Sequence, residues 1–308
     1  MAARLAELTA AGRSVYLCGR NMGGGFFKAV RAHCKAGLPL AAHPDAVWAL
    51  TDDPPRLTAT LGVTITEQRP AGFVPLPLAD YEPGYWKAFL AAANLSEPEI
   101  VLACAQDHGL HPGKSSREGR FRLWERFLRE ADGHPEALVY VTPPVELTRL
   151  ATLQQSIGGG PVADTAAAAV LGLLTDPAIK ARSAETGVML VNMGNSHTVA
   201  ALVFRNRIYG IYEHHTGMLP PEEIWNDLER FRRGALTNAE VFDRGGHGCL
   251  TLALPPEAGI FSYTSVIGPK RALLSGFDVD FPSPGGDMML TACFGLIHWL
   301  RTRKKEVV

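Results

Sequence analysis

The sequence has few cysteines, and their spacing does not suit a metal cluster. The 308-residue chain contains five, widely separated, and they form no CxxC or CxxxCxxC run: Cys18, Cys34, Cys104, Cys249 and Cys293. Zinc knuckles and iron–sulfur clusters take their ligands from such runs. We therefore expect no iron–sulfur cluster. We also expect the cysteines to pack as thiols in a reducing, cytoplasmic compartment.

The chain also lacks an excess of charge and a long apolar run. Lysine and arginine number 30 and aspartate and glutamate 31, which gives a formal net charge of −1. Without a cluster of basic residues the sequence predicts neither nucleic acid nor a membrane surface as a partner. No apolar run approaches the roughly 20 residues of a membrane span. With 46% hydrophobic residues, the composition is that of a globular protein.

Several common catalytic motifs are absent as well. The chain has no GxSxG for a serine nucleophile and no HExxH, HxH or HxxxH that would give two metal ligands from one element. Gly113-Lys114-Ser115 is similar to the end of a P-loop, but the glycine required five positions earlier is His108. Pro112 also lacks a backbone N–H group. A P-loop is therefore excluded.

What is present is an alternation of strand and helix patterns, which predicts an α/β fold. Residues 99–105 form an apolar run of strand length and predict an inner strand of a covered sheet. The glycine-rich segment 158–161 breaks the chain near its midpoint. We expect a first α/β lobe over residues 1–160 and a second over residues 161–308.

The most informative stretch, residues 187–203, is typical of two buried strands joined by a tight polar turn. Small residues in such a turn allow backbone N–H groups to converge on a phosphate oxygen, although an ordinary hairpin has the same pattern. The predicted phosphate-binding residues are Gly194, Asn195, Ser196, His197 and Thr198.

Further candidates follow other predicted strands. Asp107 and His108 come after residues 99–105, at the sheet edge where α/β proteins bind ligands, although a solvated loop is equally consistent. Gly268 and Lys270 open a predicted helix whose N-terminus suits an anion or a nucleotide. Asp287 begins the last predicted helix.

The chain has ten histidines, several of them beside glycines in predicted loops. His214 and His215 are adjacent, so in an extended segment they cannot both point the same way. A metal site would need one of them with other ligands from among His108, His197, His247 and Asp243. The alternative is that His214, His215 and His247 contact a ligand through hydrogen bonds.

Four segments in order resemble the second lobe of the ASKHA superfamily of sugar kinases, heat-shock chaperones and actin: Val162–Gly172, Asn192–Thr198, Val266–Pro269 and Asp287–Leu300. The resemblance implies a two-lobed α/β fold with ATP and magnesium in an interlobe cleft. Asn192 replaces the acidic residue of the phosphate hairpin, which weakens phosphotransfer. Because the chain opens inside a predicted helix, the first lobe lacks its phosphate hairpin and looks N-terminally short.

A closer resemblance covers most of the chain. The segments that carry it are Arg20–Gly25, Gln106–Gly109, Gly194–Thr198, Glu213–Gly217, Leu236–Asp243, Gly245–Gly248 and Gly286–Thr291. They resemble a prokaryotic family of unknown function that is often labelled "putative pyruvate formate-lyase activating enzyme". That label implies a CxxxCxxC cluster, which this sequence lacks, so radical iron–sulfur chemistry is rejected.

Three hypotheses follow. The first is a protein that binds a nucleotide or phosphorylated small molecule between Gly194–Thr198, Gly268 and Lys270, with Asp107 as general base and Asp287 as the magnesium-side acid. The second is a metal-dependent hydrolase or lyase that uses His108, His197, His215 and Asp243. The third is a non-catalytic scaffold that binds a partner or forms a homo-oligomer.

Overall fold

The computed structural model describes residues 1–19, 26–51, 54–111 and 115–306. These residues divide into two compact units. The first comprises residues 1–101, 109–116 and 143–160, and the second comprises residues 102–108, 117–142 and 161–308. The chain therefore passes between the units several times. The candidate loops at 20–25 and 112–114 lie outside the described residues.

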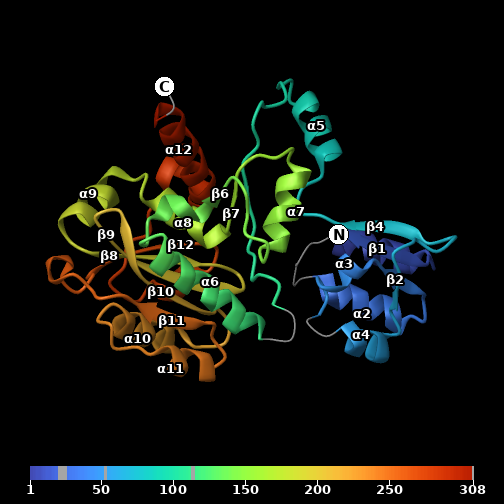
Figure 1. Ribbon diagram of the computed structural model, residues 1–308, viewed down its shortest axis with the longest axis horizontal. Helices are drawn as coiled ribbons and strands as arrows, with labels where there is room; N and C mark the ends of the chain where they lie inside the picture. The colour runs from blue at the N-terminus through green and yellow to red at the C-terminus, as the bar shows by residue number, and fades with distance from the viewer. Residues whose placement is uncertain (20–25, 52–53, 112–114, 307–308) are drawn as a thin grey trace. The chain divides into compact units, whose positions relative to one another are not determined.

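The first unit is built on a parallel sheet (Figure 1). Its strands, in spatial order, are β3 (Thr64–Ile65), β2 (Leu40–Ala42), β1 (Val15–Gly19) and β4 (Val74–Leu78). Its helices are α1 (Ala2–Ala10), α2 (Phe27–Lys35), α3 (Pro44–Val47), α4 (Pro54–Leu61), α5 (Pro83–Ala92) and α7 (Thr148–Ser156). The core forms because β1 and β2 are apolar and buried, and Leu5 and Val30 from the helices pack against them.

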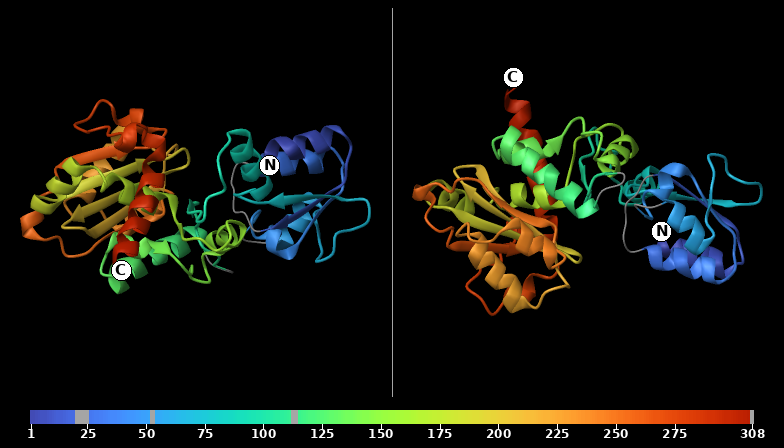
Figure 2. Two further views of the ribbon diagram at one scale, coloured as in Figure 1. Left: turned by 90° about the horizontal axis from the view of Figure 1, so that it is seen from above. Right: turned by 60° about the horizontal axis from the view of Figure 1, so that its bottom comes forward.

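The second unit contains a five-stranded mixed sheet (Figure 2). Its order is β11 (Gly248–Thr251), β10 (Arg207–His215), β9 (His197–Phe204), β8 (Val188–Met193) and β12 (Tyr263–Ile267). Strands β8, β9 and β10 form an antiparallel meander, and β12 runs parallel to β8. The alternation of strands and helices in both units confirms the α/β class predicted from the sequence.

Helices cover both faces of this sheet because its strands alternate between two apolar cores. Val188 and Leu190 pack with α6 and α8, whereas Met189 and Val191 pack with α10 and α11. The remaining helices and single turns of the unit are α6 (Ser116–Glu130), η2 (Pro135–Leu138), α8 (Thr165–Leu173), α9 (Pro177–Glu185), α10 (Pro221–Phe231), α11 (Asn238–Asp243), η3 (Pro256–Ala258), η4 (Arg271–Leu274), η5 (Pro284–Gly286), η6 (Met288–Leu290) and α12 (Thr291–Glu306).

A three-stranded sheet, also in the second unit, shows that one prediction from the sequence needs correction. It joins β5 (Ala103–Cys104), β7 (Val162–Ala163) and β6 (Val139–Tyr140). The long inner strand expected over residues 99–105 is therefore wrong, since two residues of that run pair as a strand. The chain leaves the first unit after Val101, and Ile100 is exposed. The apolar run therefore gains strand partners only at its end.

Helices α8 and α12 pack closely because glycines face each other at their contact. A Cβ atom at Gly295 would lie 2.5 Å from both the Ala168 carbonyl oxygen and the Gly172 nitrogen. We expect Gly295→Ala to destabilise the second unit by about 1–3 kcal/mol through overpacking. The melting temperature should fall by roughly 3–10 °C. Gly276→Ala is the matched control, since a Cβ there meets no atom within 4 Å. Equal melting temperatures for both variants would contradict this packing.

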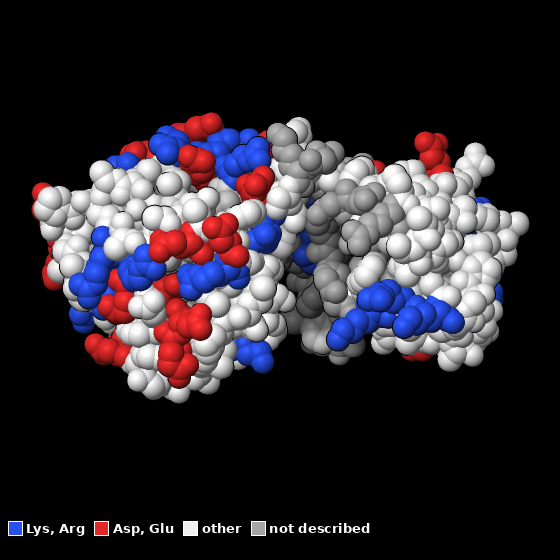
Figure 3. Space-filling view, turned by 90° about the horizontal axis from the view of Figure 1, so that it is seen from below, with Lys and Arg blue, Asp and Glu red and all other residues white. Residues whose placement is uncertain are grey.

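The distribution of charged side chains agrees with the balanced numbers of acidic and basic residues. Acidic and basic side chains are interspersed over the face of the second unit drawn in Figure 3. Within the described ranges, no helix is both long and apolar enough to cross a membrane.

Candidate metal centre and the adjoining pocket

The pairing of β9 with β10 places three candidate ligand side chains on one face of the sheet. His215 lies opposite His197, and Glu213 lies opposite Val199. Because side chains alternate along a strand, Glu213 and His215 share the face of His197, and His214 points to the other face. His247 precedes β11, and its backbone N–H group donates to the Glu213 carbonyl oxygen at 2.9 Å. Local sheet geometry thus brings His197, Glu213 and His247 together.

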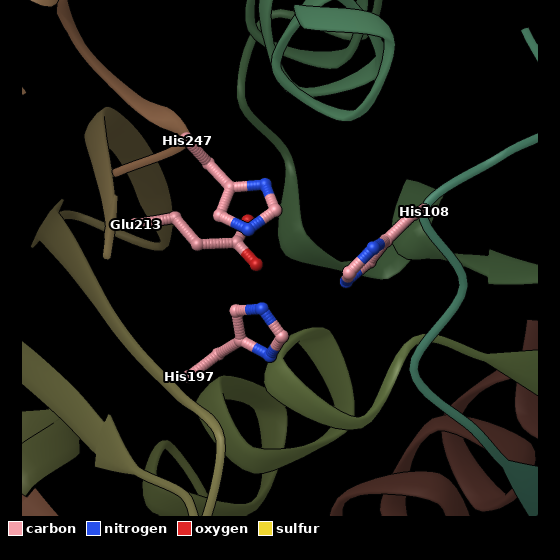
Figure 4. Close-up of side chains that lie close together, drawn as sticks. All are labelled: His108, His197, Glu213 and His247. Carbon is pink, nitrogen blue, oxygen red and sulfur yellow. The ribbon is translucent and has the colours of Figure 1, made fainter. Parts of the chain in front are cut away.

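His108, in the segment after β5, completes a group of four (Figure 4). One ligand atom from each of His108, His197, Glu213 and His247 lies within 4.8 Å of the other three. The His108 ring centroid is 4.9 Å from that of His197 and 5.0 Å from that of His247. Ligand atoms on opposite sides of an ion are about 4.2 Å apart when each bond is about 2.1 Å. The four side chains can therefore close on one ion with small rotations.

Five polar atoms of this group are buried without a hydrogen-bond partner among the described residues. Both ring nitrogens of His197, both of His247 and the Oε1 oxygen of Glu213 make no hydrogen bond within the described part of the chain. Glu213 is fully buried and His247 is 1% exposed. Buried polar groups without partners are costly, and at functional sites they commonly indicate a missing ion or ligand. A bound metal ion would satisfy these atoms.

The second carboxylate oxygen of Glu213 is held by helix α6. Its Oε2 atom accepts hydrogen bonds from Arg120 Nε at 3.0 Å and from Trp124 Nε1 at 2.8 Å. Arg120 Nη1 donates to the Asp107 carbonyl oxygen at 2.7 Å and to Asp164 Oδ2 at 2.9 Å. One buried guanidinium therefore fixes the carboxylate ligand and the backbone that carries His108. Hydrogen bonds to a ligand side chain from its surroundings orient that ligand around a metal.

Burial sets the protonation states in this group. It lowers the pKa of His108 and of His197 to about 4, and that of His247 to about 3. For Glu213 burial alone would raise the pKa, but Arg120 and the nearby imidazoles hold it well below its usual range. Neutral imidazoles and an ionised carboxylate are the forms that bind metal ions. Burial also lowers the pKa of His215, whose ring centroid is 4.6 Å from that of His197.

A pocket of about 290 Å³ adjoins the group and shares His197 with it. Its walls come from the turn between β8 and β9, the start of α8, the end of β12 and the segment around α12. Its lining consists of Gln106, Thr165, Ala166, Ala169, Asn192, Gly194, Asn195, Ser196, His197, Val199, Ile267, Gly268, Pro269, Met288, Met289 and Ala292. Aspartate, glutamate, lysine and arginine are absent from this described lining.

Five predicted site residues line this pocket: Gly194, Asn195, Ser196, His197 and Gly268. Thr198 does not, because its buried hydroxyl lies 3.0 Å from that of Thr216, which in turn donates to the Gly194 carbonyl oxygen. Thr198 therefore helps to fix the turn from behind. Lys270 is exposed and outside the lining.

The remaining predicted residues are placed elsewhere. Asp107 is fully buried, and its backbone N–H group donates to Asp164 Oδ2 at 3.2 Å. Asp287 accepts from the Met289 N–H group at 2.9 Å and so caps η6. His214 stacks on Tyr212, with ring centroids 6.4 Å apart, and Asp243 ends α11 outside the four-residue group.

Sequence reasoning identified His108, His197 and His247 but missed Glu213. The signal was present, because a residue two positions before His215 must share its face in an extended strand. The five cysteines lie in five separate elements, β1, α2, β5, β11 and α12, and all are free thiols.

Comparison with known proteins gives one family match. The model of the family described as "Putative pyruvate format-lyase activating enzyme (DUF1786)" matches residues 22–273. No curated protein matches the sequence. Among solved structures, the chain is similar to MreB 5 of Spiroplasma citri bound to AMPPNP, with 12% identity and a TM-score of 0.32. That match covers 66% of this chain and 79% of the other.

Proposed function

The chain belongs to the family described as "Putative pyruvate format-lyase activating enzyme", and we propose that it is a metal-dependent hydrolase whose ion is held by His108, His197, Glu213 and His247. One observation carries the proposal: four ligand atoms converge within 4.8 Å, and the ring nitrogens of His197 and His247 and the Oε1 atom of Glu213 have no hydrogen-bond partner in the described chain. Burying such atoms without an ion would lower stability for no structural gain.

The donor set narrows the choice of metal. Imidazole and carboxylate ligands suit zinc, iron, manganese or cobalt, and they do not suit an iron–sulfur cluster. Four protein ligands would close a tetrahedral site, whereas a five- or six-coordinate ion keeps at least one open position. When bound, such an ion supplies a Lewis acid and a water whose pKa falls to about 7. The pocket beside His197 provides room for a substrate at that position.

Metal analysis of full-length protein purified without a histidine tag tests this proposal. We expect one transition-metal ion per chain, removal by a strong chelator, and hydrolysis of a p-nitrophenyl ester that is lost with the ion and restored on adding it back. A folded protein that takes up no metal would reject the proposal.

A second candidate function is the binding of a nucleotide or phosphate without turnover. It is supported by the lining of the pocket, which includes Asn195 and Ser196 from the candidate phosphate turn and Gly268 from the candidate nucleotide loop. Thermal-shift measurements with ATP, ADP and inorganic phosphate, each with and without magnesium, test it. If no ligand raises the melting temperature, this candidate is rejected.

A further inference from the structure

The pocket that adjoins His197 is lined by both polar and apolar side chains. The two kinds are mixed where the sheet forms its wall, since Asn192 pairs with Val199 on one side and with Ile267 on the other. The polar members are Gln106, Asn192, Asn195 and Ser196, and the apolar members are Ala169, Val199, Ile267, Met288, Met289 and Ala292. A complementary ligand therefore has a polar head near His197 and an apolar body.

The turn between β8 and β9, which contributes Gly194, Asn195 and Ser196 to the pocket lining, offers backbone donors. The Gly194 N–H group donates to the His197 carbonyl oxygen at 2.9 Å and closes the turn. A Cβ at Gly194 would lie 2.8 Å from that oxygen, so the turn needs a glycine. Within the described chain no protein acceptor is used by the N–H groups of Asn195 and Ser196. Successive N–H groups in a turn form a concavity that binds anions.

The charge of the pocket and of the proposed ion limits how many negative charges a bound anion can carry. The described lining contains no lysine or arginine to neutralise a triphosphate and no carboxylate to hold its magnesium ion. A divalent ion on Glu213 and three neutral imidazoles would leave one positive charge beside His197. That charge suits a single phosphate group, which carries about 1.5–2 negative charges at neutral pH. The three terminal oxygens of a phosphate can also be shared between the ion and the two N–H groups, whereas a carboxylate has two.

We infer that the substrate of the proposed metal centre is a phosphate monoester with an apolar organic group, bound between the turn at Gly194–His197 and the ion on His197, with its organic group against Met288 and Met289. This inference rests on the proposed function. The inference adds the chemical class of the substrate and the orientation of the substrate in the pocket.

Calorimetric titration of the full-length protein with phenyl phosphate tests the inference. We expect binding to the metal-loaded protein at least about tenfold tighter than to the metal-free protein, because the described lining has no lysine or arginine and the ion would supply the positive charge. Inorganic phosphate and ATP should each bind the metal-loaded protein more weakly than phenyl phosphate, the first because it lacks the apolar group and the second because it carries too much charge.

Two variants locate the ligand. Ser196→Pro removes one N–H donor, and we expect phenyl phosphate to bind about 10–100-fold more weakly, while Ser196→Ala keeps the N–H group and should weaken binding less than Ser196→Pro does. Met289→Glu places a negative charge beside the apolar lining residues and should weaken phenyl phosphate more than inorganic phosphate. The metal content of each variant shows whether the centre itself is intact.

The outcomes separate this inference from the proposed function. Equal affinity of the metal-loaded and metal-free proteins for phenyl phosphate would overturn the inference and leave the metal centre standing. Tighter binding of ATP or of phenylacetate than of phenyl phosphate would do the same. A protein that binds no metal would overturn both.

Discussion

Replacing His247 with glutamine is expected to lower the affinity of the protein for zinc or manganese by more than about 100-fold, since loss of a hydrogen bond that only orients a ligand already costs about 10–100-fold. Both ring nitrogens of His247 are buried and have no hydrogen-bond partner among the described residues, and the His247 ring centroid is 4.9 Å from that of His197. An uncharged amide is a much weaker ligand than an imidazole. The measurement is competition for the metal with a chromophoric chelator at fixed pH.

The matched control is His214→Gln. His214 is equally buried, at 1% exposure, but it lies on the opposite face of β10 against Tyr212. We expect its replacement to leave metal affinity within about threefold of the starting value, the range in which contacts vary with context. If both substitutions weaken metal binding equally, loss of fold explains the effect and the assignment of His247 as a ligand is wrong.

Removing Arg120 should cause the largest loss of stability in the second unit. Its guanidinium is 4% exposed and pairs with Asp164 at 2.9 Å and Glu213 at 3.0 Å, so Arg120→Met leaves two carboxylates buried without a counter-charge. Breaking a buried pair in this way costs about 3–5 kcal/mol. Urea denaturation, followed by the fluorescence of Trp124 on the same helix, measures the change in the free energy of unfolding.

Arg122→Met is the control for that experiment. Arg122 lies on the same helix and pairs with Glu118 at 3.3 Å, but both side chains are about half exposed, at 52% and 49%. Exposed pairs contribute about 0–1 kcal/mol because water and salt screen them. A loss below about 1 kcal/mol for Arg120→Met would mean that the buried network does not hold the ligand carboxylate.

The meander and the parallel strand of the second unit could be predicted because their signals are local. Strands β8 and β9 meet at the turn predicted within residues 187–203. Apolar alternation and a glycine-containing turn determine these elements without distant contacts. Helix α9 (Pro177–Glu185) also carries local signals, since Asp176 caps it and Pro177 starts it.

The candidate centre could be predicted only in part, because its assembly depends on strand register and tertiary packing. The histidine candidates were recognisable from their loops, but no local pattern brings His108 to His247, which lies in a different loop far along the chain. Glu213 lies between Tyr212 and His214 in a strand, and its proposed role becomes visible only when its register with β9 and its contact with Arg120 are known. Asp243 has the right chemistry but lies at the end of α11, outside the group.

X-ray absorption spectroscopy of the metal-loaded, full-length protein tests the central claim most directly. The account predicts a first shell of nitrogen and oxygen atoms at about 2.0–2.2 Å, with the outer-shell scattering of about three imidazole rings. In His247→Gln protein that imidazole signal should decrease or the metal should be lost. A first shell of sulfur atoms at about 2.3 Å would contradict the account and assign the metal to the cysteines.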